Sequence, residues 1–195
     1  MSTGRHSAFS AAALRRCLPV LLFLVSIGIG SASIVHADAL APGTAAFSRG
    51  DYVRAARFLS PLAARGNARA LGLLGFLYEH GFGVPQAYDA AADLYAQGAV
   101  QGDPFAQAML GLMYDKGHGV PQDFVLAYRW LDLAAARTRG HDRDTYARLR
   151  DAVDSKMSPV EIVEAQRLAL YWTPVRFDPT MRAQRGPWDS RHHRD

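Results

Sequence analysis

The stretch ALGLLGFLYEHGFGVPQ at residues 70–86 returns 36 residues later as AQAMLGLMYDKGHGVPQ at residues 106–122. Nine of the seventeen aligned positions are identical. The same shift relates further positions on both sides: Tyr52, Ala55 and Leu59 to Tyr88, Ala91 and Tyr95, and then to Phe124, Ala127 and Leu131. A period of this length is typical of stacked helical units, so the sequence predicts two full repeats with a partial one before them.

Each unit is predicted to be a helix, a turn and a second helix. In the first helix Ala70, Leu74 and Tyr78 lie on one face, because an α-helix has about 3.6 residues per turn. Gly75 and Gly111 each cost a helix about 1 kcal/mol relative to Ala. We therefore expect a packing reason for both glycines, namely the close approach of the partner helix.

The residues between the helices fit this interpretation. Gly81 and Gly117 lie where a left-handed residue ends a helix. Asp51 and Asp123 are suitable N-caps for second helices. Ala87 occupies the equivalent position in the middle unit, so its second helix should begin less firmly.

The frame A-x3-LG-x2-Y-x2-GxGVPQD-[YF]-x2-A resembles the Sel-1-like repeat, a relative of the tetratricopeptide repeat. The match covers residues 67–137, whereas residues 40–66 look more like a tetratricopeptide unit. The resemblance implies an α-solenoid that binds proteins, often in bacterial envelope or secretory assemblies. It does not identify the partner.

The predicted fold class is therefore all-α, a solenoid of antiparallel helix pairs with about three and a half units. The expected division of the chain is a signal peptide, an N-terminal tetratricopeptide-like partial unit, two Sel-1-like repeats, a C-terminal capping helix pair and a disordered tail: residues 1–37, 38–66, 67–102, 103–138, 139–174 and 175–195.

The capping pair begins with an amphipathic stretch at Thr145–Ser155. Ser158 and Glu161 then form a capping box, with Pro159 at the first helical position. We expect this last helix to run to about Trp172 and to turn one face inward: Ile162, Val163, Ala165, Leu168, Ala169 and Trp172.

The first 37 residues have the pattern of a secretory signal peptide. Two arginines precede an apolar core at Leu18–Ile29, which is too short to cross a bilayer as an ordinary spanning helix. We expect cleavage after Ala37, with Ala39 as the alternative; an uncleaved anchor is the rival interpretation. General secretion is favoured over twin-arginine export, because the residues after the arginine pair fit that motif poorly.

Charge and cysteine content exclude several classes of protein. Lys and Arg number 22 against 18 Asp and Glu, but without the first 37 residues the balance is 19 to 18. A nearly neutral balance does not favour nucleic-acid binding, which needs clustered Lys and Arg side chains. The only cysteine, Cys17, lies in the signal, which excludes disulfides, cysteine nucleophiles and Cys-ligated zinc from the mature chain. Arg outnumbers Lys 20 to 2, as in GC-rich bacteria, so we expect a periplasmic location in a Gram-negative bacterium.

The sequence carries no established catalytic or nucleotide-binding motif. Gly81-Phe82-Gly83 and Gly117-His118-Gly119 follow helices rather than strands, which indicates turns and not phosphate loops. The His192-His193 pair lacks the three or four ligands of a defined metal site. We therefore expect no catalytic residue, no metal and no cofactor.

A partner-binding groove is predicted from the resemblance, because the first helix of each tetratricopeptide-type unit lines the concave surface. The positions of the two first helices that internal packing is expected to leave free are Arg69, Gly72, Phe76 and Glu79, and then Phe105, Ala108, Leu112 and Asp115. His80 and Lys116 are expected at the rim. An apolar middle at Phe76 and Leu112, with acids at one end, suits a protein segment with an apolar anchor and one basic residue. The alternative is that Phe76 and Leu112 pack against neighbouring helices.

The predicted function is an exported protein–protein interaction module or adaptor of a bacterial envelope assembly, without catalysis of its own. Its partner would be another protein or a peptide segment, with no nucleic acid and no membrane span after signal cleavage. The alternatives are a cell-wall-acting envelope enzyme or enzyme-modulating subunit, and a structural scaffold of an exopolysaccharide or secretion complex.

Overall fold

The structure is a computed structural model that describes residues 31–176, with side chains from residue 39 onward. The chain divides into two units, residues 1–38 and 39–195, and helix α1 begins in the first and ends in the second. In the described residues every element is a helix: α1 (Ser31–Ser48), α2 (Tyr52–Ala64), α3 (Ala68–His80), α4 (Tyr88–Val100), α5 (Pro104–Lys116), α6 (Phe124–Arg137), α7 (Gly140–Asp154) and α8 (Pro159–Leu170). This confirms the predicted all-α class. The predicted signal-peptide core and most of the predicted tail lie outside the described residues.

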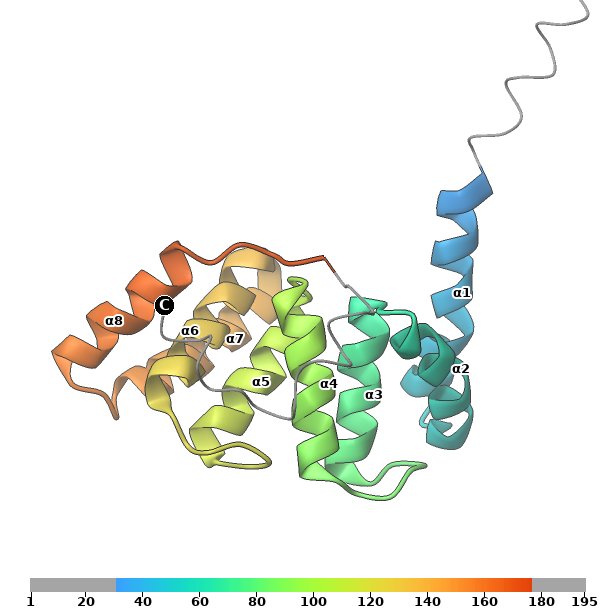
Figure 1. The fold of residues 1–195 in the computed structure, drawn as a ribbon, viewed down its shortest axis with the longest axis horizontal. Helices are drawn as coiled ribbons and strands as arrows, with labels where there is room; N and C mark the ends of the chain where they lie inside the picture. Colours follow the sequence, from blue (N-terminus) through green and yellow to red (C-terminus); the bar gives the residue numbers. More distant parts are fainter. Residues whose placement is uncertain (1–30, 177–195) are drawn as a thin grey trace, which may run out of the picture. The chain divides into compact units, whose positions relative to one another are not determined.

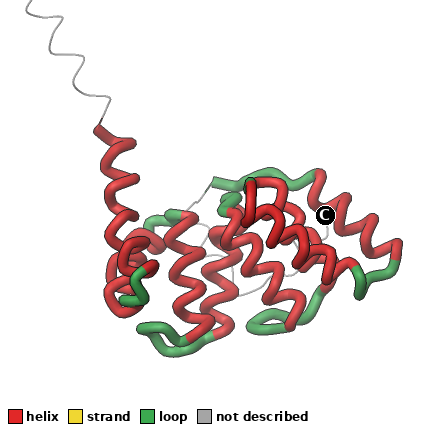
Figure 2. Tube along the Cα trace, turned by 180° about the vertical axis from the view of Figure 1, so that it is seen from behind, coloured by secondary structure: helices red, strands yellow, loops and turns green. Residues whose placement is uncertain are grey.

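Within the second unit the helices pair as the repeat predicts (Figures 1 and 2). Helices α3 and α4 form one repeat and α5 and α6 the next, whereas α7 and α8, predicted as a capping pair, both pack against α6. Each helix from α2 to α6 packs against the next one along the chain, α3 also packs against α5, and α8 packs against α6. The arrangement is a solenoid of helix pairs, as expected, and it places the first helices α3 and α5 side by side.

The helices begin at residues that cap them. Asp51 and Asp123 accept hydrogen bonds from backbone N–H groups of the first turns of α2 and α6, as predicted. Ala87 makes no such bond at the start of α4, also as predicted. Asn67 and Asp103 cap α3 and α5 in the same way, although neither was predicted as a cap.

The helix ends explain the glycine pattern. Gly81 and Gly117 end α3 and α5 in the left-handed conformation, with φ of 68° and 69°. Gly83 lies against the start of α2, where a Cβ would come within 2.6 Å of the Tyr52 backbone carbon. A Cβ at Gly119 would likewise overlap the carbonyl of Tyr88 on α4. The second glycine of each turn is therefore required by contact with the preceding unit.

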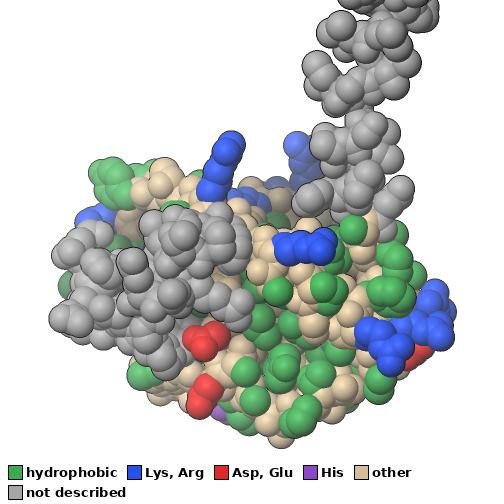
Figure 3. All heavy atoms as spheres, turned by 45° about the vertical axis from the view of Figure 1, so that its right-hand side comes forward, with side chains coloured by type: hydrophobic (Ala, Val, Ile, Leu, Met, Phe, Trp, Pro, Cys, Tyr) green, Lys and Arg blue, Asp and Glu red, His purple; other side chains and the backbone are tan. Residues whose placement is uncertain are grey.

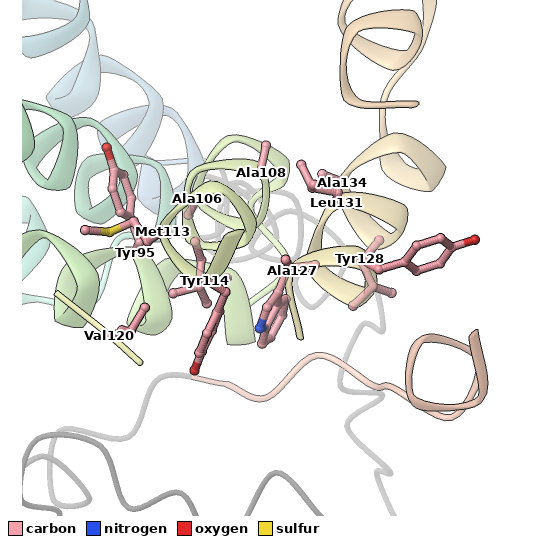
Figure 4. Close-up of a cluster of buried hydrophobic side chains, with 14 of the residues drawn as sticks. Tyr95, Ala106, Ala108, Met113, Tyr114, Val120, Ala127, Tyr128, Leu131 and Ala134 are labelled. Carbon is pink, nitrogen blue, oxygen red and sulfur yellow. The ribbon is translucent and has the colours of Figure 1, made fainter. Parts of the chain in front are cut away.

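The predicted packing role of the two helical glycines is confirmed. A Cβ at Gly75 would lie 2.9 Å from the ring of Tyr95, and one at Gly111 would lie 2.8 Å from Cγ of Leu131. Both glycines thus let the first helix of a repeat approach the second closely. The largest buried cluster is built around this contact, where α4, α5 and α6 meet (Figure 4), and it includes Val153 of α7.

The C-terminal pair differs from expectation in detail. Helix α7 begins at Gly140, before the expected amphipathic stretch, and α8 ends at Leu170 rather than Trp172. The prediction that Val163 faces inward is wrong, because its side chain is 65% exposed. The inward face is carried by Ala165 and Ala169, both of which are buried.

The residues after α8 return across the array rather than leaving it at once. Trp172 packs edge-on against Trp130 of α6, with 6.2 Å between ring centroids, and the Arg137 guanidinium lies 4.3 Å from its centroid. The backbone N–H of Val175 donates to the carbonyl of Val100, at the end of α4 (2.8 Å). This segment therefore ties the last helix pair to the two repeats before it (Figure 1).

Candidate functional site

The eight candidate residues lie on the first helices of the two repeats, in α3 and the facing α5. We call them the first-helix face: Arg69, Phe76, Glu79, His80, Phe105, Leu112, Asp115 and Lys116. Each of these eight is half-buried or exposed. The prediction that Gly72 and Ala108 also line the groove is wrong, because both are buried against neighbouring helices. Seen from the α2 side, the molecular surface has hydrophobic side chains spread among Lys, Arg and other polar groups (Figure 3).

The structure brings four of these residues together in one row. The Phe76 ring stacks on His80 at 4.1 Å and lies 6.2 Å from the ring of Phe105 on the next first helix. The Arg69 guanidinium lies 4.9 Å from the centroid of Phe105. Its Nη1 is 3.8 Å from Oδ1 of Asp103. Contacts of this kind between rings and a guanidinium hold the row in place while leaving its outer edges in solvent.

Three rings outside the predicted groove extend the row. Phe47, near the end of α1, meets Phe76 edge-on at 5.4 Å, and Phe82, in the turn after α3, lies 6.1 Å from Phe76. Tyr52, at the start of α2, stacks on Phe82 at 4.6 Å. The 36-residue shift pairs Phe82 with His118 and Tyr52 with Tyr88, and His118 also contacts Tyr88, at 5.0 Å but with the rings tilted rather than stacked. The repeat pattern could therefore have indicated this contact.

Phe76 and Leu112 lie in different surroundings. Phe76 is half-buried and packs against the core, so the alternative that it contacts neighbouring helices is true of part of its surface. Leu112 is also half-buried, yet it is not among the residues packed against either core cluster. Leu112 is therefore the apolar side chain of the face that internal packing uses least.

The two acids of the face have partners within the chain. The Tyr95 hydroxyl donates to Oε2 of Glu79 (2.8 Å), and burial together with this carboxylate raises the pKa of Tyr95 far above its usual value. Nζ of Lys156, in the turn before α8, donates to Oδ1 of Asp115 (2.6 Å). Neither carboxylate is thus an open site for a basic residue, whereas the rings and Leu112 keep part of their surface accessible.

The first turn of α5 holds a buried carboxylate at the edge of the face. Asp103 accepts a hydrogen bond from the backbone N–H of Ala106 (2.8 Å) while Arg69 lies nearby. Burial raises the pKa of Asp103, against the opposing effect of that N–H group and of Arg69. This pair fixes the turn of α5 and places Arg69 beside Phe105.

The described residues offer little to other kinds of chemistry. No group of three or more His, Asp or Glu side chains in residues 39–176 could hold a metal ion. None of the helices in the described part of the chain is long and apolar enough to cross a membrane.

Comparison with known proteins agrees with this architecture. The family described as Sel1 repeat matches residues 68–103 and 104–138. A protective antigen present in uropathogenic Escherichia coli strains, which displays an SLR fold, is similar over 72% of this chain and 31% of its own, with 27% identity and a TM-score of 0.62. A Sel1 repeat protein from Oxalobacter formigenes is 32% identical, over 55% of this chain and 44% of its own, with a TM-score of 0.49. No curated protein matches the chain.

The matched ranges confirm the resemblance that the 36-residue period indicated. Sel1 repeats are units of protein–protein interaction, which supports protein binding as the broad function. The chain spans less than half the length of either similar structure, 31% of one and 44% of the other.

Proposed function

We propose that this chain, which contains two Sel1 repeats, is an exported, periplasmic interaction module or adaptor of a bacterial envelope assembly, and that it has no catalysis of its own. The repeats support protein binding, and the pattern of the first 37 residues supports export. The absence of catalytic motifs from the sequence supports a binding role.

One observation carries the proposal: the first helices of both repeats present half-buried apolar side chains that remain accessible. Phe76 and Phe105 are held in position by ring contacts, and Leu112 is not used by either core cluster. Rings fixed in this way lose little conformational freedom when a partner covers them. They are the kind of side chain that contributes most to protein–protein interfaces.

The shape of the site favours a segment of a protein as the ligand. Two neighbouring first helices offer a row of apolar positions, which fits an extended or helical segment that inserts an apolar anchor. Because Glu79 and Asp115 have partners of their own, affinity is expected to come from this anchor more than from a charge on the segment.

Affinity capture from solubilised envelope tests the site, with the chain from Asp38 onward as bait. Phe76→Ala combined with Leu112→Ala should weaken capture of the partner by about 2 kcal/mol or more, the scale of interface hot spots. Val53→Ala is the matched control, because Val53 is an exposed apolar residue of α2, outside the face. It should leave capture unchanged.

The double variant must be folded for this comparison, because Phe76 also contacts Phe47 and Phe105. Its far-UV circular dichroism should match that of the native chain. Leu112→Ala alone gives a second test, since Leu112 makes no contact with the core clusters. Full capture by folded forms of both variants would refute the site.

Export has a separate test, which is the sequence of the N-terminus of the protein isolated from the envelope fraction. We expect Asp38, or Leu40 if the alternative site is cleaved. An N-terminus at Met1 or Ser2 would refute cleavage.

A further inference from the structure

The last helix, α8, is apolar on two opposite faces. Its inner face carries Ala165 and Ala169, which are buried against the array. On the outer face Val160 and Leu170 are each 78% exposed, and Tyr171, just beyond the helix, is 74% exposed. Val163, between them, is also exposed. Spacings of three, seven and eleven residues bring these side chains onto one stripe of the helix. The terminal helix of a soluble repeat array normally has a polar outer face, so an apolar stripe there is unusual.

The preceding unit shows what normally covers such a face. When α6 and α8 are aligned from their first residues, Val163 takes the position of Tyr128 and Leu170 that of Ala135. Tyr128 and Ala135 are both 6% exposed, because α7 and α8 pack over α6. The Gln166 side chain of α8 donates to the Tyr128 hydroxyl (3.3 Å). Val163 and Leu170 therefore correspond to positions that other helices cover on α6, whereas Tyr171 corresponds to Ala136, which is exposed.

The described residues after α8 do not provide that cover. Trp172 turns toward Trp130 on the inner side of α8. Val175 is hydrogen-bonded to Val100, at the end of α4. The segment therefore runs back over the array, away from the outer face of α8 (Figure 1).

The charges on the outer face of α8 favour a second copy of this chain as its binding partner. Glu164 and Arg167 lie between the apolar residues and pair with each other at 2.8 Å. The order along the helix is thus apolar, acidic, basic, apolar: Val160, Val163, Glu164, Arg167, Leu170 and Tyr171. If a second α8 lies antiparallel to the first, the register that sets Val160 opposite Tyr171 also sets Glu164 opposite Arg167. Val160 with Tyr171 and Glu164 with Arg167 are then each matched in both directions, which is the property of a two-fold interface.

We infer that the outer face of α8 binds the same face of a second copy of this chain, forming an antiparallel, two-fold symmetric dimer. The conformation of this face is fixed before association, because the Ser158–Glu161 capping box fixes the start of α8 and the inner alanines fix its position on the array. One helix from each copy makes a small interface, so the dimer should be reversible and dependent on concentration. The first-helix face is on other helices, so this inference does not rest on the proposed function.

Sedimentation velocity over a wide range of concentrations tests the inference, with the chain from Asp38 onward. The native chain should show a reversible monomer–dimer equilibrium. Glu164→Arg alone and Arg167→Glu alone should each weaken the dimer by about tenfold or more, because each sets like charges opposite one another. Arg57→Glu makes the same change of charge as Arg167→Glu at an exposed position of α2; it is the matched control and should have no effect.

A mixture of the two single variants gives the sharpest result. One chain then carries two arginines and the other two glutamates at these positions, so an antiparallel heterodimer is complementary although neither variant pairs well with itself. The internal Glu164–Arg167 pair is not restored in either chain, which separates association from helix stability. Equal thermal midpoints would show that both variants are folded.

We expect the mixture to dimerise as the native chain does. A native chain that stays monomeric at every concentration would overturn the inference and leave the face to residues 177–195 or to another protein. A mixture that stays monomeric, or an equal loss in Arg57→Glu, would overturn it as well.

Discussion

Gly111 offers the strictest test of how closely the two helices of a repeat pack. Replacing it with Ala adds one carbon, which would lie 2.8 Å from Cγ of Leu131 and 3.0 Å from the carbonyl oxygen of Ala127. Both neighbours belong to α6, and the oxygen is part of its backbone. The clash can therefore be relieved only if α5 moves away from α6.

Two opposing effects set the size of the change. In a helix interior, Ala is favoured over Gly by about 1 kcal/mol. Overpacking of a well-packed core costs about 1 to 3 kcal/mol. Because the obstacle includes backbone, the cost should exceed the gain, and we expect Gly111→Ala to lower the free energy of unfolding by about 1 kcal/mol. Gly111→Leu should lower it further and melt part of the array.

Urea unfolding followed by far-UV circular dichroism measures the difference. Gly72→Ala is the control, since Gly72 is also helical but the nearest atoms to its added carbon are 3.2 Å away and belong to side chains. It should lower the free energy of unfolding less than Gly111→Ala does. If Gly111→Ala is instead stabilised by the full helix preference, or Gly111→Leu unfolds like the native chain, then α5 and α6 are not in close contact.

Two capping substitutions give further predictions. Ala87→Asp should raise the free energy of unfolding by about 1 kcal/mol, because Ala87 has the same backbone conformation as Asp123, which caps α6; no change in urea unfolding would contradict this. Asp103→Asn should be at least as stable as the native chain at pH 7, since Asn67 already caps α3 and a buried charge is removed. Because the pKa of Asp103 is higher in the folded chain than in the unfolded one, protonation of this carboxyl stabilises the fold. That stabilisation is fully present below the unfolded pKa, about 3.9, and is lost as pH rises through the folded value. The advantage of Asp103→Asn should therefore shrink in acid, and an advantage that is the same at pH 4 and pH 7 would contradict the burial of this charge.

The helices and turns of the repeats could be predicted because their determinants are local. Gly81 ends a helix through its own backbone conformation, and Asp51 caps α2 through a residue three positions on. The 36-residue period then supplied the pairing, because equal units stack in equal ways. Even the missing cap at Ala87 could be predicted from comparison with its equivalents.

Other features depend on contacts that are not repeated from one unit to the next, so the 36-residue period could not predict them. The position of Tyr95 is occupied by leucine in the units on either side, so its bond to Glu79 had no counterpart to reveal it. Lys156, which binds Asp115, lies outside the matched repeats. Val163 was misassigned because α8 is apolar on both faces, and periodicity alone cannot distinguish the inner from the outer one.

The central claim is that a partner protein binds the first helices of the two repeats. Site-specific photo-crosslinking in the envelope tests it directly, with a photoreactive residue placed at Leu112 in one chain and at exposed Val53 of α2 in another. We predict a covalent adduct with another protein from position 112 and none from position 53. An adduct from position 53 with none from position 112 would contradict the claim.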